Sequence, residues 1–111
     1  MNETLADLQD KLMRLHRKLR DQLAETDDVA RRRALLNEMV EVTHRIQVVG
    51  ALLFAAESAT LDGKVKEVSA ATKKVNQAIA QIKHFQAFLD TLADFLGLVD
   101  EAIDLAKGLM I

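Results

Sequence analysis

The chain has 111 residues, half of them hydrophobic, and a formal net charge of −2 at pH 7. This length is that of one domain with enough apolar residues for a core, which excludes a disordered chain. The absence of cysteine excludes disulfide frameworks, thiolate metal sites and cysteine nucleophiles, and the small net charge excludes strong overall attraction to nucleic acid or anionic membranes.

The composition is typical of long, uninterrupted helices. Proline, tryptophan and tyrosine are absent, while Ala, Leu, Val and charged residues dominate the sequence, which favours helix throughout. We therefore expect one helical domain over residues 1–111. Residues 1–5 lack the basic region and apolar run of a signal peptide, so a cytoplasmic location is expected.

The first predicted helix spans about residues 3–25. Asn2 or Thr4 is placed to cap it, and Asp7 follows Thr4 by three residues as in a capping box. Leucines recur along one face at helical spacing, at Leu5, Leu8, Leu12, Leu15, Leu19 and Leu23. The polar stretch 25–28 predicts a turn in which Asp27 or Asp28 caps the next helix.

The second predicted helix spans about residues 28–60. Its apolar residues alternate at spacings of four and three, as in a coiled coil, at Leu35, Met39, Val42, Ile46, Val49, Leu53 and Ala56. Between Ile46 and Ala56 only Gln47 is polar, so this half is expected to lie centrally or to meet another apolar surface. Gly63, in the stretch 61–64, predicts a stop before the next helix.

The third predicted helix runs from about residue 64 to residue 108 without a convincing break. Between Ile79 and Phe85 the apolar spacing is three and three, which indicates local overwinding or a small kink. A straight helix here would be about 65 Å long and would extend past the second helix. Its apolar end must then either bend back into the chain or be covered by another chain.

These elements predict an all-α fold, an elongated antiparallel three-helix bundle or coiled coil, or a four-helix bundle if the last helix bends. We favour the straight helix because no turn residues mark a return. Residues 85–111 carry two adjacent apolar stripes, which are too wide for one neighbour, so this segment is expected to pack against at least two helices.

Charge on the last predicted helix favours self-association. Segment 64–84 has five Lys and one Glu, whereas segment 85–111 has five acidic residues and one Lys, so two antiparallel copies would match in charge. We therefore expect a homo-oligomer, with an antiparallel dimer favoured. The predicted contacts are Phe88, Phe95, Leu98, Ala102, Leu105 and Leu109, with Asp90, Asp94 and Glu101 fixing orientation against Lys66, Lys73 and Lys74. The alternative is that both stripes are intramolecular core.

Sequence motifs for nucleic-acid binding, metal binding or catalysis are weak. Basic residues gather near the first predicted turn, but the acidic residues beside them and the lack of aromatic residues there argue against nucleic-acid binding. Glu41 and His44 have the Glu-x-x-His spacing of di-iron helical bundles, but the sequence supplies no second pair. We expect no metal, no cofactor and no catalytic residue, and hence no enzyme.

The sequence therefore predicts a non-catalytic helical module for protein–protein interaction or oligomerisation. One alternative is a membrane-interacting amphipathic protein, similar to helical pore-forming proteins, because residues 85–111 are strongly apolar on one side. The other is an adaptor or inhibitor that offers an apolar helix face to a different protein.

Overall fold

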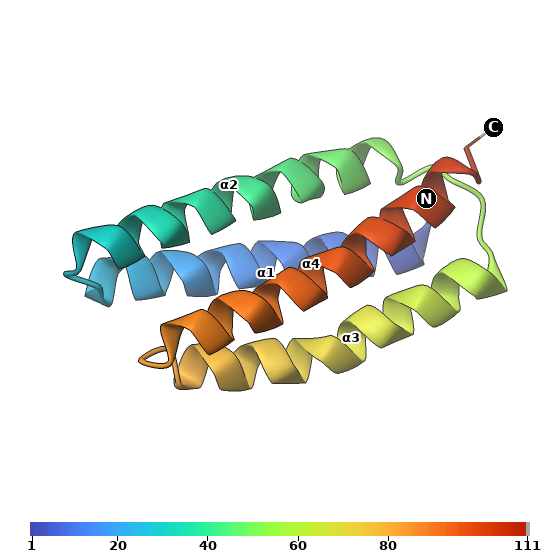
Figure 1. Cartoon of the computed structure of the whole chain (residues 1–111). Coiled ribbons are helices and arrows are strands. Elements are labelled where there is room, and N and C mark those ends of the chain that lie inside the picture. Colours follow the sequence, from blue (N-terminus) through green and yellow to red (C-terminus); the bar gives the residue numbers. More distant parts are fainter. Residues whose placement is uncertain (111) are drawn as a thin grey trace.

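The computed structural model of the chain describes residues 1–110. Over this range the chain forms four α-helices, α1 (Glu3–Glu25), α2 (Val29–Ala51), α3 (Ala59–Ala80) and α4 (Phe85–Lys107). The Cα atoms extend over 46 × 21 × 16 Å, so the molecule is elongated along its helices (Figure 1). Ile111, which the sequence analysis included in the apolar end of the last helix, lies outside the described residues.

The helices form a bundle of two antiparallel hairpins. Helix α1 packs along α2, and α3 packs along α4, while α1–α3 and α2–α4 contacts join the two hairpins. Because the connection 52–58 returns the chain across the bundle, the neighbours α1 and α3 run in the same direction (Figure 1). The all-helical bundle is thus confirmed, and α4 contacts two helices as its two apolar stripes predicted.

Helix α1 has the predicted bounds and the predicted apolar face. Asn2 caps it, since the Asn2 side chain accepts a hydrogen bond from the Leu5 amide at 3.1 Å. The alternative cap, Thr4, instead donates its hydroxyl hydrogen bond to Asp62 of α3 at 2.7 Å. The leucines of the predicted face are buried except Leu23, which is partly buried. Asp28 caps α2, as the polar turn predicted.

The second turn differs from the prediction, because α2 ends at Ala51 and not near residue 60. The backbone of the connection 52–58 hydrogen-bonds elsewhere: Leu53 O accepts from the Asn2 amide at 2.6 Å, and the Ala56 amide donates to Leu109 O at 3.0 Å. Ser58 then caps α3. Gly63 therefore lies inside α3, without the positive φ that the predicted stop requires.

The favoured straight helix over residues 64–108 was wrong, because this segment divides into α3 and α4 around the turn 81–84. The turn coincides with the irregular spacing between Ile79 and Phe85, and no glycine or proline marks it. Folding back buries the apolar end of the segment, since Leu92, Val99 and Ala106 are all fully buried. The four-helix alternative named for a bent last helix is the arrangement found among residues 1–110.

Candidate protein interaction site

The predicted interface residues divide into two groups in the structure. Phe88, Phe95 and Ala102 are only 1%, 2% and 0% exposed and belong to the core of their own chain. The remaining apolar residues, Leu98, Leu105 and Leu109, are partly buried against that core. Since α4 packs on α2 and α3 of the same chain, most of its apolar surface is not open to a second copy in this arrangement.

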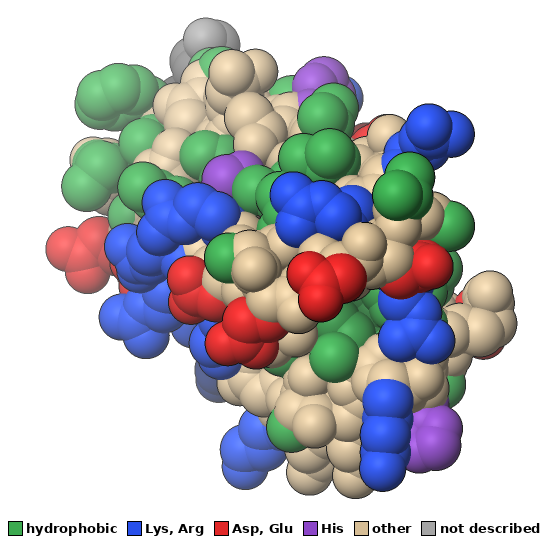
Figure 2. All heavy atoms as spheres, turned by 90° about the vertical axis from the view of Figure 1, so that its left-hand side faces the viewer, with side chains coloured by type: hydrophobic (Ala, Val, Ile, Leu, Met, Phe, Trp, Pro, Cys, Tyr) green, Lys and Arg blue, Asp and Glu red, His purple; other side chains and the backbone are tan. Residues whose placement is uncertain are grey.

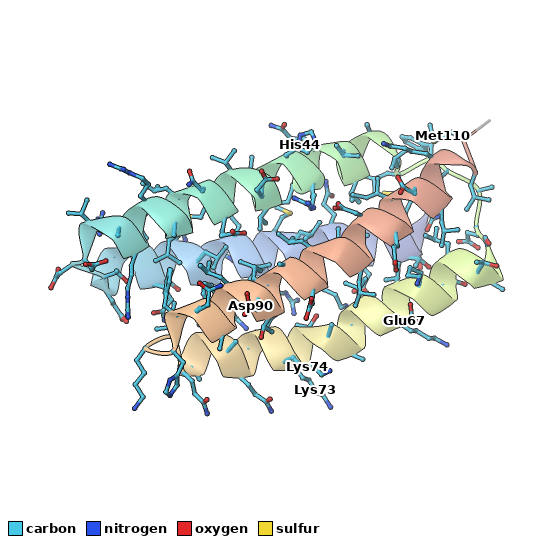
Figure 3. All side chains as sticks on the ribbon, in the orientation of Figure 1. His44, Glu67, Lys73, Lys74, Asp90 and Met110 are labelled. Carbon is cyan, nitrogen blue, oxygen red and sulfur yellow. The ribbon has the colours of Figure 1, made fainter. Side chains whose placement is uncertain are left out.

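The charge complementarity of segments 64–84 and 85–111 lies largely within one hairpin. Helices α3 and α4 are antiparallel neighbours, and Lys64 Nζ lies 2.9 Å from Glu101 Oε2. Figure 3 shows Lys73 and Lys74 on α3 and Asp90 on the adjacent α4. The pairing of a basic segment with an acidic one, which was the reason for predicting an antiparallel dimer, is therefore available inside a single chain.

Large hydrophobic side chains are exposed at two places among residues 1–110. One group lies at the termini and in the connection 52–58 and consists of Met1, Phe54 and Met110. The other lies on the first hairpin and consists of Met13 on α1 with Val29, Leu36 and Val40 on α2. The described part of α3 and α4 contributes none.

The outer side of α2 carries a second apolar seam. Val29, Leu36 and Val40 are 70%, 48% and 67% exposed, and their spacing of seven and four places them on one helix face. The inner seam of Leu35, Val42 and Val49 lies on the other side of the helix and is buried. Helix α2 is thus apolar toward the core and toward solvent, which is typical of a helix that contacts another apolar surface.

A shallow groove runs beside this seam, between α1 and α2. It is lined by His16 of α1 and by six residues of α2, which are Leu36, Met39, Val40, Thr43, His44 and Gln47. Its volume is ≈ 470 Å³. We call the groove together with Met13, Val29, Leu36 and Val40 the docking strip.

Three arginines lie on the helix faces that form the docking strip. Arg17 and Arg20 follow Met13 by four and seven residues on α1, and Arg33 lies between Val29 and Leu36 on α2. All three are exposed, and none takes part in an ion pair within residues 1–110. In the end-on view of Figure 2, hydrophobic side chains gather at the upper left, the side of α1 and α2, above a group of Lys and Arg side chains.

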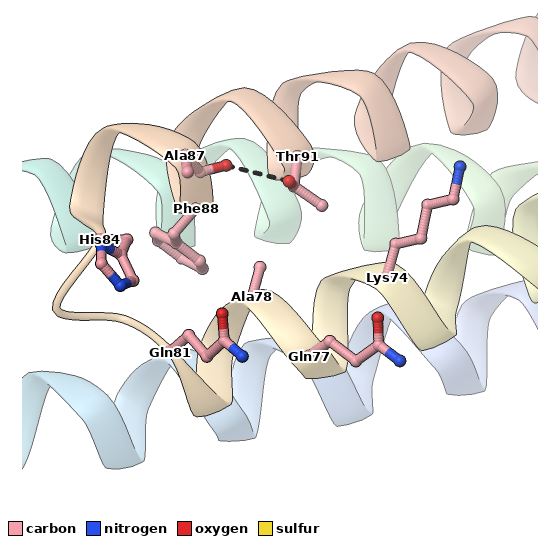
Figure 4. Close-up of a pocket in the computed structure, with 8 residues that line it drawn as sticks. All are labelled: Lys74, Gln77, Ala78, Gln81, His84, Ala87, Phe88 and Thr91. Atoms are coloured by element: carbon pink, nitrogen blue, oxygen red, sulfur yellow. Dashed lines mark hydrogen bonds between the residues drawn. The ribbon is translucent and has the colours of Figure 1, made fainter.

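A second hollow lies between the end of α3 and the start of α4. Its lining, shown in Figure 4, consists of Lys74, Gln77, Ala78, Gln81, His84, Ala87, Phe88 and Thr91. The Thr91 hydroxyl donates to Ala87 O at 2.9 Å, so it is engaged in its own helix. The lining contains one Lys and one His and no carboxylate.

The metal motif considered for α2 is not assembled. His44 projects from the outside of α2 (Figure 3), and Glu41 accepts from Arg45 at 3.1 Å. In the described part of the chain, no three His, Asp or Glu side chains are grouped so that they could hold a metal ion.

Comparisons with known protein families, with curated proteins and with solved structures gave no match to this chain. Across residues 1–110, no helix combines the length and the apolar character needed to cross a membrane. The sequence analysis did not predict the docking strip. The spacing of Val29, Leu36 and Val40 nevertheless indicates a second apolar face on α2.

Proposed function

We propose that this protein is a non-catalytic interaction module that binds a helix of another protein along the docking strip. The observation that carries the proposal is the exposure of Val29, Leu36 and Val40 on one face of α2. Fully burying such a side chain contributes roughly 1.5–3 kcal/mol, and an apolar face with helical spacing is the usual receptor surface for an amphipathic helix.

The proposal moves the contact surface from α4 to α1 and α2. The six apolar residues predicted on α4 are buried or half-buried in their own chain, whereas the docking strip offers side chains that are mostly open to solvent. The function class, non-catalytic protein–protein interaction, is the one expected from the sequence; the form proposed, an adaptor that presents an apolar helical face to a partner, was one of its alternatives. The antiparallel homodimer stays a prediction, and light scattering after size exclusion tests it.

The test of the docking strip uses a synthetic amphipathic helical peptide. The peptide carries Leu at i, i+3, i+4 and i+7 and Gln at the flanking positions, and its binding is measured by fluorescence anisotropy. We expect binding to the unaltered chain and a loss of at least about tenfold in the double variant Leu36→Glu, Val40→Glu, because two carboxylates would have to be buried. Circular dichroism checks that the double variant keeps its helices.

The matched control is Phe54→Glu, which places a carboxylate on an exposed hydrophobic position away from the docking strip. It should bind the peptide as the unaltered chain does. Equal loss in both variants, or no binding of the peptide to the unaltered chain, would overturn the proposed function.

A further inference from the structure

Building on the proposed function, we infer that the partner helix is acidic: it carries carboxylates along the edge of the apolar face that enters the docking strip. The strip supplies apolar area for binding, and its arginines supply selectivity for charge. Opposite charges at the rim of an interface act mainly on partner choice and association rate.

The arginines lie beside the groove because of the register between α1 and α2. Gln9 Nε2 donates to Ile46 O at 3.2 Å, and Arg32 donates to Leu23 O at 2.5 Å. For two antiparallel helices, these contacts place Arg20 about level with Leu36 and Arg17 about level with Met39. Arg33 lies one turn before Leu36 on α2 itself. The three arginines therefore lie around the half of the groove nearer the α1–α2 turn, where exposed Lys and Arg side chains outnumber the exposed carboxylates of residues 21–28.

The combination of free arginines and exposed apolar side chains is specific to this surface. Other cations are engaged: Lys11 pairs with Asp7, and Arg45 pairs with Glu41 and Asp100. Exposed lysines also occur on α3, including Lys66, Lys73 and Lys74, but no exposed large hydrophobic residue accompanies them among the described residues. A partner that is both apolar and acidic is thus matched by the docking strip, where three arginines without an ion pair in the described part of the chain accompany exposed hydrophobic side chains.

A second copy of this chain fits the docking strip poorly. Two strips placed face to face would bring both sets of Arg17, Arg20 and Arg33 into one interface, and like charges there are unfavourable. Helix α4 is the acidic helix of the chain, but its Phe88 and Phe95 are buried, so it cannot offer them to the groove of a neighbour. These features favour a different protein as the source of the acidic helix.

The experiment compares three peptides that share one apolar face and differ only in the residues beside it, Glu, Gln or Lys. Their dissociation constants for the full chain are measured by anisotropy at low salt and at 0.5 M NaCl. Exposed ion pairs contribute little individually, so three of them together should make the Glu peptide bind about tenfold more tightly than the Gln peptide at low salt. The Lys peptide should bind most weakly, and salt should reduce the difference.

The arginines are tested with the triple variant Arg17→Gln, Arg20→Gln, Arg33→Gln. Its matched control is Lys66→Gln, Lys73→Gln, Lys74→Gln, which removes the same charge from the outside of α3. We expect the first variant to bind the Glu and Gln peptides equally, and the control to keep the preference for Glu. Binding of the Gln peptide by both variants shows that the docking strip is intact.

Several outcomes would overturn the inference and leave the proposed function standing. These are equal affinity of the Glu and Gln peptides for the unaltered chain, or equal loss of the preference in both triple variants.

Two other outcomes would assign the docking strip to a different occupant. A dimer in light scattering that Leu36→Glu with Val40→Glu dissociates would assign the strip to a second copy. Binding to vesicles of phosphatidylcholine and phosphatidylglycerol, but not to the Glu peptide, would assign it to a lipid surface.

Discussion

Arg45 of α2 and Asp100 of α4 form a two-point ion pair that ties the two hairpins together. Arg45 Nε lies 2.8 Å from Asp100 Oδ1, and Arg45 Nη2 lies 2.9 Å from Asp100 Oδ2. The hydrogen bond to Asp100 is the main cause that raises the pKa of the Arg45 guanidinium above its ordinary value. The pair sits where α2 and α4, neighbours from different hairpins, contact one another.

We expect Asp100→Asn to lower the free energy of unfolding by about 0.5–1 kcal/mol, because a partly exposed pair with two-point geometry is at the upper end for surface ion pairs. Urea unfolding followed by circular dichroism measures the change. Asp94→Asn is the control, since Asp94 is exposed on the same helix and forms no ion pair within residues 1–110. The loss for Asp100→Asn should shrink in 1 M NaCl, and a loss unaffected by salt would argue against the ion pair.

Asn2 is a buried polar side chain at the end of the bundle, and its replacement should be costly. Its side chain accepts from the Leu5 amide and donates to Ala55 O at 3.3 Å and to Ala56 O at 3.2 Å. Asn2→Ala removes the cap and leaves backbone groups unpaired, so we expect a loss of about 2–3 kcal/mol in urea unfolding.

The variant Asn2→Asp separates the two roles of Asn2. An aspartate keeps the acceptor that caps α1 but loses the amide that donates to Ala55 and Ala56. Because the second carboxylate oxygen then faces the Ala55 and Ala56 carbonyl oxygens, the loss measured for Asn2→Asp is an upper limit for the contribution of the contact to the connection 52–58. A stability close to that of the unaltered chain would show that the cap of α1 is the larger contribution.

Gly63→Ala should stabilise the protein. Gly63 lies inside α3, is exposed, and has no atom within 4 Å of an added Cβ. Alanine favours a helix interior over glycine by about 0.8–1 kcal/mol, so a gain of up to that size is expected in urea unfolding. If Gly63 were instead a left-handed helix stop, the same change would destabilise the protein.

Glu38 should make stability depend on pH. Burial is the main cause that raises its pKa above the ordinary value of 4.5, the nearby Glu41 adds to the rise, and Arg45 partly offsets it. The folded state therefore disfavours the ionised form, so the penalty is present above the folded pKa and disappears below the unfolded pKa. We expect Glu38→Gln to raise the melting temperature at pH 7 and to lose this advantage as the pH falls through the raised pKa toward 4.5.

The control for Glu38 is Glu57→Gln, at an exposed position in the connection 52–58. Its melting temperature should follow that of the unaltered chain from pH 7 downward. An advantage of Glu38→Gln that persists to pH 3 would mean that the glutamine acts through packing and not through the charge of the carboxylate.

Periodicity and capping rules were sufficient for the parts of the fold that are determined locally. The leucine face of α1 and the caps Asn2 and Asp28 follow from spacing and side-chain chemistry over a few residues. The inner seam of α2 was also found correctly, because Leu35, Val42 and Val49 repeat at coiled-coil spacing and are buried.

The two later turns could not be predicted because they depend on contacts distant in sequence. The connection after α2 is bonded to Asn2, more than fifty residues away, and the turn 81–84 is favoured by the burial of α4. The connection 52–58 and the turn 81–84 contain no glycine or proline, so local propensity favoured continued helix. The missed turn 81–84 also led to the interface prediction, since an unbent helix would have left Phe88 and Phe95 uncovered.

Both ends of the described chain are bonded to the same connection. The Asn2 amide donates to Leu53 O, and Leu109 O accepts from the Ala56 amide, so the start of α1 and the end of α4 lie together at one end of the bundle (Figure 1). The fold is therefore suited to circular permutation. A short linker could join the present ends, and new ends could be opened in the exposed turn around Lys83 without cutting any helix.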